Sequence, residues 1–84
     1  MPYVLRKTRD KASGNQIIEG SPDVFIDGFA AVRQNDHVSD GSKFIPPLSP
    51  TLFINGRPAA RVGDRTDAGD IGQSIGSAEV SADE

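Results

Sequence analysis

The sequence predicts an all-β domain, a small cone of short β-hairpins with pseudo-threefold internal repeats and long loops. Three observations lead to this prediction. Segment 20–36 (GSPDVFIDGFAAVRQND) recurs at 48–64 (LSPTLFINGRPAARVGD), an offset of 28 residues, with eight of 17 aligned positions identical. Each copy places an Asx-Gly pair after a short β-favouring run, which is the strongest short-range signal for a hairpin. Nine glycines and six prolines leave few uninterrupted windows for a helix.

Each full repeat is expected to form one hairpin. Ser-Pro starts an extended segment, and the apolar run that follows favours a strand. Helix is the competing assignment for the return segment, but Pro58 in the second copy argues against it. The expected strands are 24–26 and 52–54, the turns 27–28 and 55–56, the return strands 29–34 and 57–62, and the long loops 11–19, 37–47 and 65–75.

The repeats predict a single domain over residues 1–84 that contains three units. Residues 76–80 (GSAEV) match the start of a unit, and the pair Lys7…Asp10 keeps the spacing of Arg33…Asp36. The expected parts are a half unit at 1–19, full units at 20–47 and 48–75, and a half unit at 76–84.

The return strand 57–62 has unusually small central side chains. Alternation puts Ala59 on one face and Ala60 on the other, so another backbone can approach the strand closely. Pro58 cannot donate to a ladder and marks an edge or a bend. Three such strands could converge about an axis to give a three-sided body. An ordinary small β-sandwich with an alanine-rich edge is the alternative.

Composition and charge narrow the functional classes. A chain of 84 residues buries a small core and is marginally stable as a monomer. The absence of cysteine excludes disulfides, thiolate zinc sites and cysteine nucleophiles. The basic run 6–9 has no interleaved aromatic residues and the net charge is −3, which predicts a solvated strand and no nucleic-acid binding. The apolar runs are too short for a membrane span or a signal peptide, so synthesis in the cytoplasm is expected.

Residues 49–64 resemble the signature of the PAAR-repeat proteins, and 20–28 is similar to the same family's GSP-x-V-F-I-x-G element. The signature residues are Pro58, Ala59, Ala60, Arg61 and Asp64. The resemblance extends over most of residues 7–80. It implies a cone of β-hairpins that forms the sharpened tip of a trimeric β-helical spike, in type VI secretion systems and contractile phage tails. The implied location is a phage tail tip in the virion, or secretion through a contractile injection apparatus, with transient contact with a target membrane.

Three similar units in one chain can match the threefold end of a homotrimer, so one chain per trimer is expected. Such a cap would also cover the open strand edges of the fibre. The candidate docking residues are Val24, Ile26, Leu52, Ile54 and Val80, for which a place in the internal core is the competing interpretation. The alternative function is an adaptor that links an effector cargo to the spike.

The family commonly holds one metal ion near the point, with histidines and a cysteine that follow the repeat aspartates. Four residues after those aspartates this chain has Gly14, Asp40 and Ala68. No cofactor is therefore predicted, because a lone histidine is not a zinc site. The alternative is a single ion held by the weak candidates His37, Asp40 and Asp67. Without an ion, packing is expected to hold the tip, with candidates Phe44, Ile45, Pro46, Pro47, Ile71 and Ile75.

The only acidic cluster is Asp64-x-x-Asp67-x-x-Asp70, and paired carboxyls can hydrolyse glycosides. That chemistry needs a cleft and one carboxyl whose pKa is raised by burial. The cluster lies among Gly, Thr and Ala in a predicted surface loop, and Asp64 is interpreted as a turn-capping residue. No enzyme activity and no catalytic residue are predicted.

Overall fold

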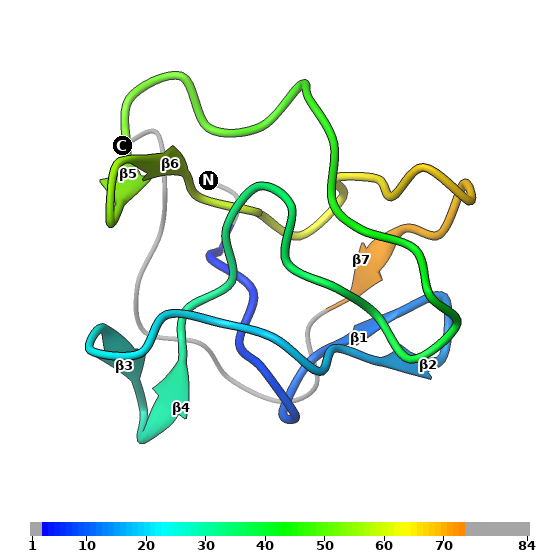
Figure 1. Cartoon of the computed structure of the whole chain (residues 1–84), viewed down its shortest axis with the longest axis horizontal. Helices are drawn as coiled ribbons and strands as arrows, with labels where there is room; N and C mark the ends of the chain where they lie inside the picture. Colours follow the sequence, from blue (N-terminus) through cyan, green and yellow to red (C-terminus); the bar gives the residue numbers. More distant parts are fainter. Residues whose placement is uncertain (1–2, 74–84) are drawn as a thin grey trace.

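The computed structural model describes residues 3–73, and this part of the chain contains strands, turns and bridges but no helix (Figure 1). The all-β prediction is confirmed. The strands are β1 (Lys11–Ala12), β2 (Asn15–Gln16), β3 (Phe25–Ile26), β4 (Phe29–Ala30), β5 (Phe53–Ile54), β6 (Arg57–Pro58) and β7 (Gly72–Gln73). They form an antiparallel sheet in the order β2-β1-β7 and two hairpins, β3-β4 and β5-β6.

The two predicted hairpins are present with the predicted turns. Phe25 pairs with Ala30 in the first hairpin, and Phe53 pairs with Pro58 in the second. The central turn residues all have positive φ, namely 53° at Asp27, 82° at Gly28, 54° at Asn55 and 76° at Gly56. Positive φ at both positions is the requirement of a type I′ turn, which explains why Asx-Gly stands at both sites.

Two of the predicted long loops contain strands. The β1-β2 hairpin lies within 11–19, where Ser13 and Gly14 form its turn with φ of 47° and 85°. Strand β7 lies within 65–75 and pairs with β1. The assignment of these segments as loops was wrong because their strands are only two residues long and contain no large apolar residue. Neither the hydrophobic alternation nor the β-branched enrichment that marks a strand is present there.

After β4 and β6 the return segments leave their hairpins and meet the N-terminal segment. We name segments 3–7, 30–34 and 58–62 the central ring, because backbone hydrogen bonds close them into a circle. Leu5 N donates to Ala60 O (2.9 Å), Ala60 N donates to Val32 O (3.0 Å), and Val32 N donates back to Leu5 O (3.0 Å). This cyclic pattern defines a quasi-threefold axis.

A second cycle of hydrogen bonds surrounds the first and runs in the opposite sense. Its three bonds are Lys7 N to Ala30 O (2.8 Å), Gln34 N to Pro58 O (3.0 Å) and Val62 N to Tyr3 O (2.8 Å). The ring is therefore closed on all three sides, and none of its segments is left as an open sheet edge. This closure excludes the sandwich alternative and satisfies the backbone groups that a short strand would otherwise expose.

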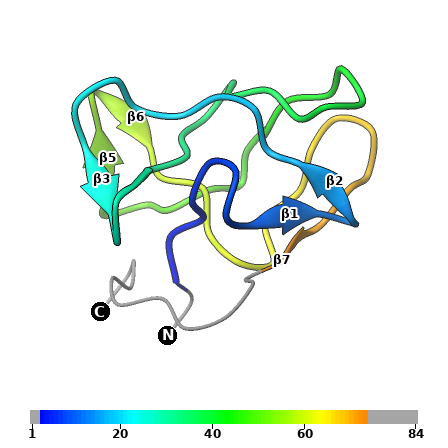
Figure 2. The same ribbon diagram turned by 90° about the horizontal axis from the view of Figure 1, so that it is seen from below.

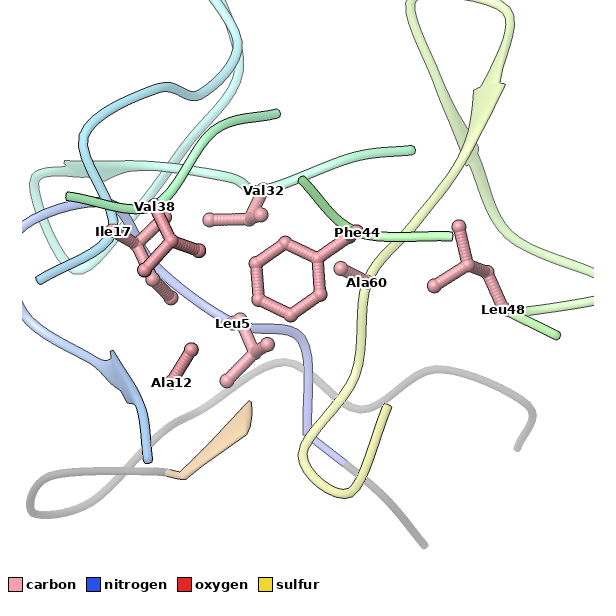
Figure 3. Packing of buried hydrophobic residues seen from close by; sticks show 8 residues of the cluster. All are labelled: Leu5, Ala12, Ile17, Val32, Val38, Phe44, Leu48 and Ala60. Carbon is pink, nitrogen blue, oxygen red and sulfur yellow. The ribbon is translucent and has the colours of Figure 1, made fainter. Parts of the chain in front are cut away.

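Alternate residues of the ring face two separate apolar clusters. Val4, Ala31 and Ala59 lie in a cluster with Ile26 and Ile54, which we name the hairpin-side cluster. The turn-side cluster contains Leu5, Ala12, Ile17, Val32, Val38, Phe44, Leu48 and Ala60. In Figure 3 the ring of Phe44 lies between Val32, Leu5 and Ala60. The predicted use of small side chains where backbones meet is thus confirmed at both alanines of the second return strand.

The two clusters correspond to two ends of the molecule. In Figures 1 and 2 the hairpins β3-β4 and β5-β6 lie at one end, which we name the hairpin end. The β2-β1-β7 sheet lies at the opposite end, together with the turns near residues 40 and 68, and we name this the turn end. The central ring lies between them, so each end is built on the same threefold frame.

Gly72 shows how tightly the sheet packs on the ring. A Cβ at this position would lie 2.5 Å from Leu5 Cδ1 and 3.2 Å from the carbonyl oxygen of Arg61. We expect Gly72→Ala to lower the free energy of unfolding by about 1–3 kcal/mol through overpacking. Chemical denaturation measures this, and Gln73→Ala, at the exposed neighbouring position, is the control. Equal stability of the two variants would contradict the close packing.

Candidate partner interface

The hairpin end exposes large apolar side chains at equivalent positions. Phe25 is 58% exposed and Phe53 is 56% exposed, and each is the first residue of its hairpin's outgoing strand. Val24, next to the first, is 37% exposed. We name Val24, Phe25 and Phe53 the apolar hairpin-end residues. Exposed phenylalanines on a small domain cost solvation free energy, and such residues are enriched where a partner binds.

The predicted docking residues are distributed over the surface and the interior of this end. Ile26 and Ile54 are 5% and 6% exposed and belong to the hairpin-side cluster, against which the half-buried Leu52 packs. Val24 is exposed, and Val80 lies outside the described residues. Phe25 and Phe53 were missed. Two-residue alternation places each phenylalanine on the opposite face from the isoleucine that follows, but it does not specify which of the two faces is exposed.

A polar network joins the two hairpins to each other. Ser21 Oγ donates to Asn55 Oδ1 (2.6 Å), and Asn55 Nδ2 donates to Asp23 Oδ1 (2.8 Å). The Asn55 amide, followed by the Ser21 hydroxyl, stabilises the ionised Asp23 carboxylate and lowers its pKa. The turn of the second hairpin is thereby tied to the loop that precedes the first, so the hairpin end is held as one unit.

Three arginine–aspartate pairs, which we name the arginine clasps, anchor the frame. In each clasp one carboxylate accepts from the Nε and Nη2 of its arginine and from the same residue's backbone N–H. The clasps are Arg6–Asp10, Arg33–Asp36 and Arg61–Asp64, with Nε to Oδ2 distances of 2.9, 3.0 and 2.9 Å. Bidentate pairing fixes geometry more strongly than a point charge does. The arginine of the Pro-Ala-Ala-Arg run therefore acts on its own turn.

The first clasp differs from the sequence expectation in two respects. The arginine partner of Asp10 is Arg6, four residues earlier, and not Lys7 at the three-residue spacing of the other clasps. Thr8 has a φ of 71°, and Asn35 (70°) and Gly63 (95°) have positive φ at the same place in the other two clasps, so Arg9 is the additional residue. The prediction of a solvated strand at 6–9 was wrong for Arg6, which is 1% exposed. Its pKa is raised above the usual value, chiefly by the hydrogen bond to Asp10.

Two clasps also reach the turns of the hairpins. Arg6 Nη1 donates to Asp27 Oδ2 (3.0 Å), and Arg33 Nη1 donates to Asn55 Oδ1 (3.1 Å). The Asx residue at each hairpin turn therefore has two tasks, since it adopts positive φ and accepts from an arginine of the central ring. This double use orients both hairpins, and hence both exposed phenylalanines, relative to the quasi-threefold axis.

The weak metal candidates have separate partners. The imidazole of His37 contacts Glu19 Oε1, and this hydrogen bond is the main cause of the lowered Glu19 pKa. Asp40 accepts from Ser42, and Asp67 accepts from Lys43 N (3.1 Å). Within residues 3–73 no three His, Cys, Asp or Glu side chains lie close enough together to hold an ion.

The acidic cluster is also divided among different contacts. Asp64 is bound to Arg61, Asp67 accepts from a backbone amide, and Asp70 accepts from Ser42 Oγ (3.2 Å). The pKa of Asp70 is raised chiefly by its hydrogen bond with Asp40, and desolvation by burial raises it less. A surface hollow of about 340 Å³ is lined by Pro47, Gly63, Asp64 and Arg65. The carboxylate beside it is already engaged by the clasp, so the cluster lacks the paired, substrate-facing carboxyls that glycoside hydrolysis uses.

The ring, the clasps and the paired hairpins define a small all-β domain in which each repeat contributes one segment to a common ring. A model of the PAAR motif matches residues 10–71, and the chain belongs to the PAAR-motif family. The chain is also 41% identical over 70 residues to double-stranded DNA deaminase toxin A of Burkholderia cenocepacia (strain H111). That match covers 77% of this chain and 5% of the toxin, so the chain spans a small fraction of the curated relative's length. None of the described residues belongs to a helix that could cross a membrane.

Proposed function

We propose that the chain is a non-enzymatic tip protein that caps one end of a trimeric β-helical spike and sharpens it for membrane piercing. The central ring is the observation that carries this proposal, because a single polypeptide with a quasi-threefold axis fits the end of a threefold-symmetric fibre. Membership of the PAAR-motif family supports the same role within a type VI secretion system or a contractile phage tail.

The hairpin end is the surface proposed to meet the spike. It carries the exposed Phe25 and Phe53 on two-stranded hairpins, whose outer edges can extend the strands of a β-helical partner. A stable complex would need about 800 Å² of buried surface on each partner. Aromatic side chains near the centre of such a contact would supply much of its free energy.

The proposed action is mechanical. A closed ring cannot lose a strand from an open edge, and three bidentate clasps fix its turns. Arg6 and Arg33 also bind the hairpin turns at Asp27 and Asn55. The domain would therefore keep its shape when force is directed through it into an envelope. The proposed location is the tip of a phage tail or of a contractile injection apparatus.

We expect the protein to bind a cognate trimeric spike at one chain per trimer, measured by mass photometry or light scattering of the mixture. Phe53→Asp should weaken the complex by about 30-fold or more, since a central aromatic anchor contributes about 2 kcal/mol or more. Phe53 is the better probe than Ile54, because Asp at the buried Ile54 would unfold the hairpin itself.

The control is Ile18→Asp. Ile18 is 46% exposed and lies two residues after β2, outside the β3-β4 and β5-β6 hairpins. Both variants should keep the melting temperature of the parent protein. Three chains per trimer, or equal weakening by the two variants, would contradict the proposed interface.

An adaptor that carries an effector is the second candidate, and the deaminase toxin favours it. In that relative the region similar to this chain occupies 5% of a much longer polypeptide, so a domain of this kind occurs within a toxin chain. If this chain links a cargo to the spike, pull-down with the spike-bound protein should retain a further protein. Binding to that protein should survive Phe53→Asp, which separates the two functions.

A further inference from the structure

The turn end of this chain does not suit the metal ion that the family commonly holds near its point. The three positions that follow the repeat aspartates by four residues are Gly14, Asp40 and Ala68, which together offer one carboxylate. The chain has a single histidine and no cysteine. A structural transition-metal site is normally filled by about four N, S or O ligands, so this donor set does not fit one.

We propose that the turn end is held without a metal ion, by a hydrogen-bonded network that joins its three turns to one another. The first turn is the β1-β2 turn at 13–14, the second lies near residue 40 and the third near residue 68. We name this the turn-end network. Its members are Ser13, Asn15, Asp40, Ser42 and Asp70, with the backbone of Gln16, Ser39 and Ile71. The inference concerns the fold of the chain and is independent of whether it caps a spike.

The network connects the first turn to the second. Ser39 N donates to Gln16 O (2.8 Å), and Asn15 Nδ2 lies 3.5 Å from Asp40 Oδ2. The backbone bond has the shorter and stronger geometry, and the side-chain contact is long. The first two turns are thus held together mainly by a main-chain hydrogen bond, so this link does not depend on a side chain.

Ser42 connects the second turn to the third. Its Oγ lies 2.5 Å from Asp40 Oδ1, within its own turn, and 3.2 Å from Asp70 Oδ2, across the gap. The Ser42 backbone N also donates to Asp40 Oδ1 (3.0 Å). Ser42 is 5% exposed, whereas Asp40 is exposed and Asp70 is half-buried, so the bonds are shielded from water on the Ser42 side. The hydroxyl has one hydrogen and donates to one carboxyl at a time, and it is the side chain that lies between Asp40 and Asp70.

The third turn returns to the first through two bonds. Ser13 N donates to Ile71 O (2.9 Å), and Ile71 N donates to Ser13 Oγ (2.8 Å). Hydrogen bonds therefore connect all three turns to one another without a bound ion. Every buried side-chain nitrogen or oxygen in the described part of the chain has a hydrogen-bond partner. An ion site left empty would instead leave such atoms without partners.

The test begins with the metal content of the purified full chain and its thermal unfolding in buffer, with EDTA, and with added Zn²⁺. We expect less than stoichiometric metal and the same melting temperature in all three conditions. A structural metal stabilises the native fold strongly, so one bound equivalent together with a lower melting temperature in EDTA would overturn the proposal.

The network itself is tested by Ser42→Ala against Ser39→Ala, a matched change at an exposed serine three residues away. Loss of a buried hydrogen-bonding hydroxyl should lower the melting temperature by about 4–8 °C, whereas the control should be near the parent value. Hydrogen exchange of the Gly41 and Gly69 amides, which lie in the second and third turns, should accelerate in Ser42→Ala alone. Equal behaviour of the two variants would refute the bridging role of Ser42.

Discussion

Replacing Asp36 by alanine is expected to lower the free energy of unfolding by about 3–5 kcal/mol, enough to unfold much of a domain this small. The Arg33 and Asp36 side chains are 9% and 2% exposed, so the substitution leaves a buried guanidinium without its bidentate partner. The same carboxylate accepts from the Arg33 backbone N–H, which would also lose its acceptor. Denaturant unfolding followed by circular dichroism measures the loss.

Asp67→Ala is the control for this prediction. Asp67 is an exposed aspartate that accepts a hydrogen bond from Lys43 N, so its loss should cost about 1 kcal/mol or less. Arg33→Lys should fail to preserve stability, since an ammonium cannot reproduce the planar two-pronged contact. If Asp36→Ala were no more destabilised than Asp67→Ala, the clasp would be a surface contact of little consequence.

The parts of the fold that the sequence predicted are those set by local chemistry. Asp27-Gly28 and Asn55-Gly56 predicted type I′ turns because few other pairs adopt positive φ at both positions. The adjacent alanines predicted close backbone approach because small side chains permit it. In both cases the cause lies within a few residues, so no knowledge of the tertiary structure was needed.

The parts that the sequence did not predict depend on contacts between distant segments. Strand β7 is only two residues long, and it is a strand only because it pairs with the distant β1. Arg6 was assigned to a solvated strand because its partner at four residues breaks the three-residue spacing of the other clasps. Thr8 has the positive φ that Asn35 and Gly63 have in the other two turns, so Arg9 is the additional residue, and nothing in the sequence indicates such an insertion.

The sequence analysis placed the candidate interface on the β3-β4 and β5-β6 hairpins, but with partly different residues from those that are most exposed there. All three residues of Val24-Phe25-Ile26 are apolar, so composition alone does not decide which of them would contact a partner. Burial of Ile26 and exposure of Phe25 follow from which face the central ring occupies, and the hairpin alone does not specify that face. The role of these residues in binding stays a prediction until the complex is measured.

The quasi-threefold arrangement of the central ring predicts that a large side chain can be moved from one ring segment to the equivalent position of another. Leu5, Val32 and Ala60 occupy equivalent positions of the central ring and share one cluster around Phe44. Leu5→Ala should cost about 2–5 kcal/mol because it leaves a cavity, and Ala60→Leu should cost about 1–3 kcal/mol because it overpacks the same cluster. The double variant Leu5→Ala/Ala60→Leu moves the large side chain to an equivalent position and conserves the total volume.

The double variant should therefore be more stable than the sum of the single effects predicts, with an interaction free energy of about 1–3 kcal/mol in a double-mutant cycle. Leu5→Ala combined with Ala68→Leu, at an exposed position outside the cluster, is the control and should be additive. Additivity in the test pair would mean that the two positions do not share one space. In that case the hydrogen-bonded ring would surround separate packing sites, and its threefold likeness would be limited to the backbone.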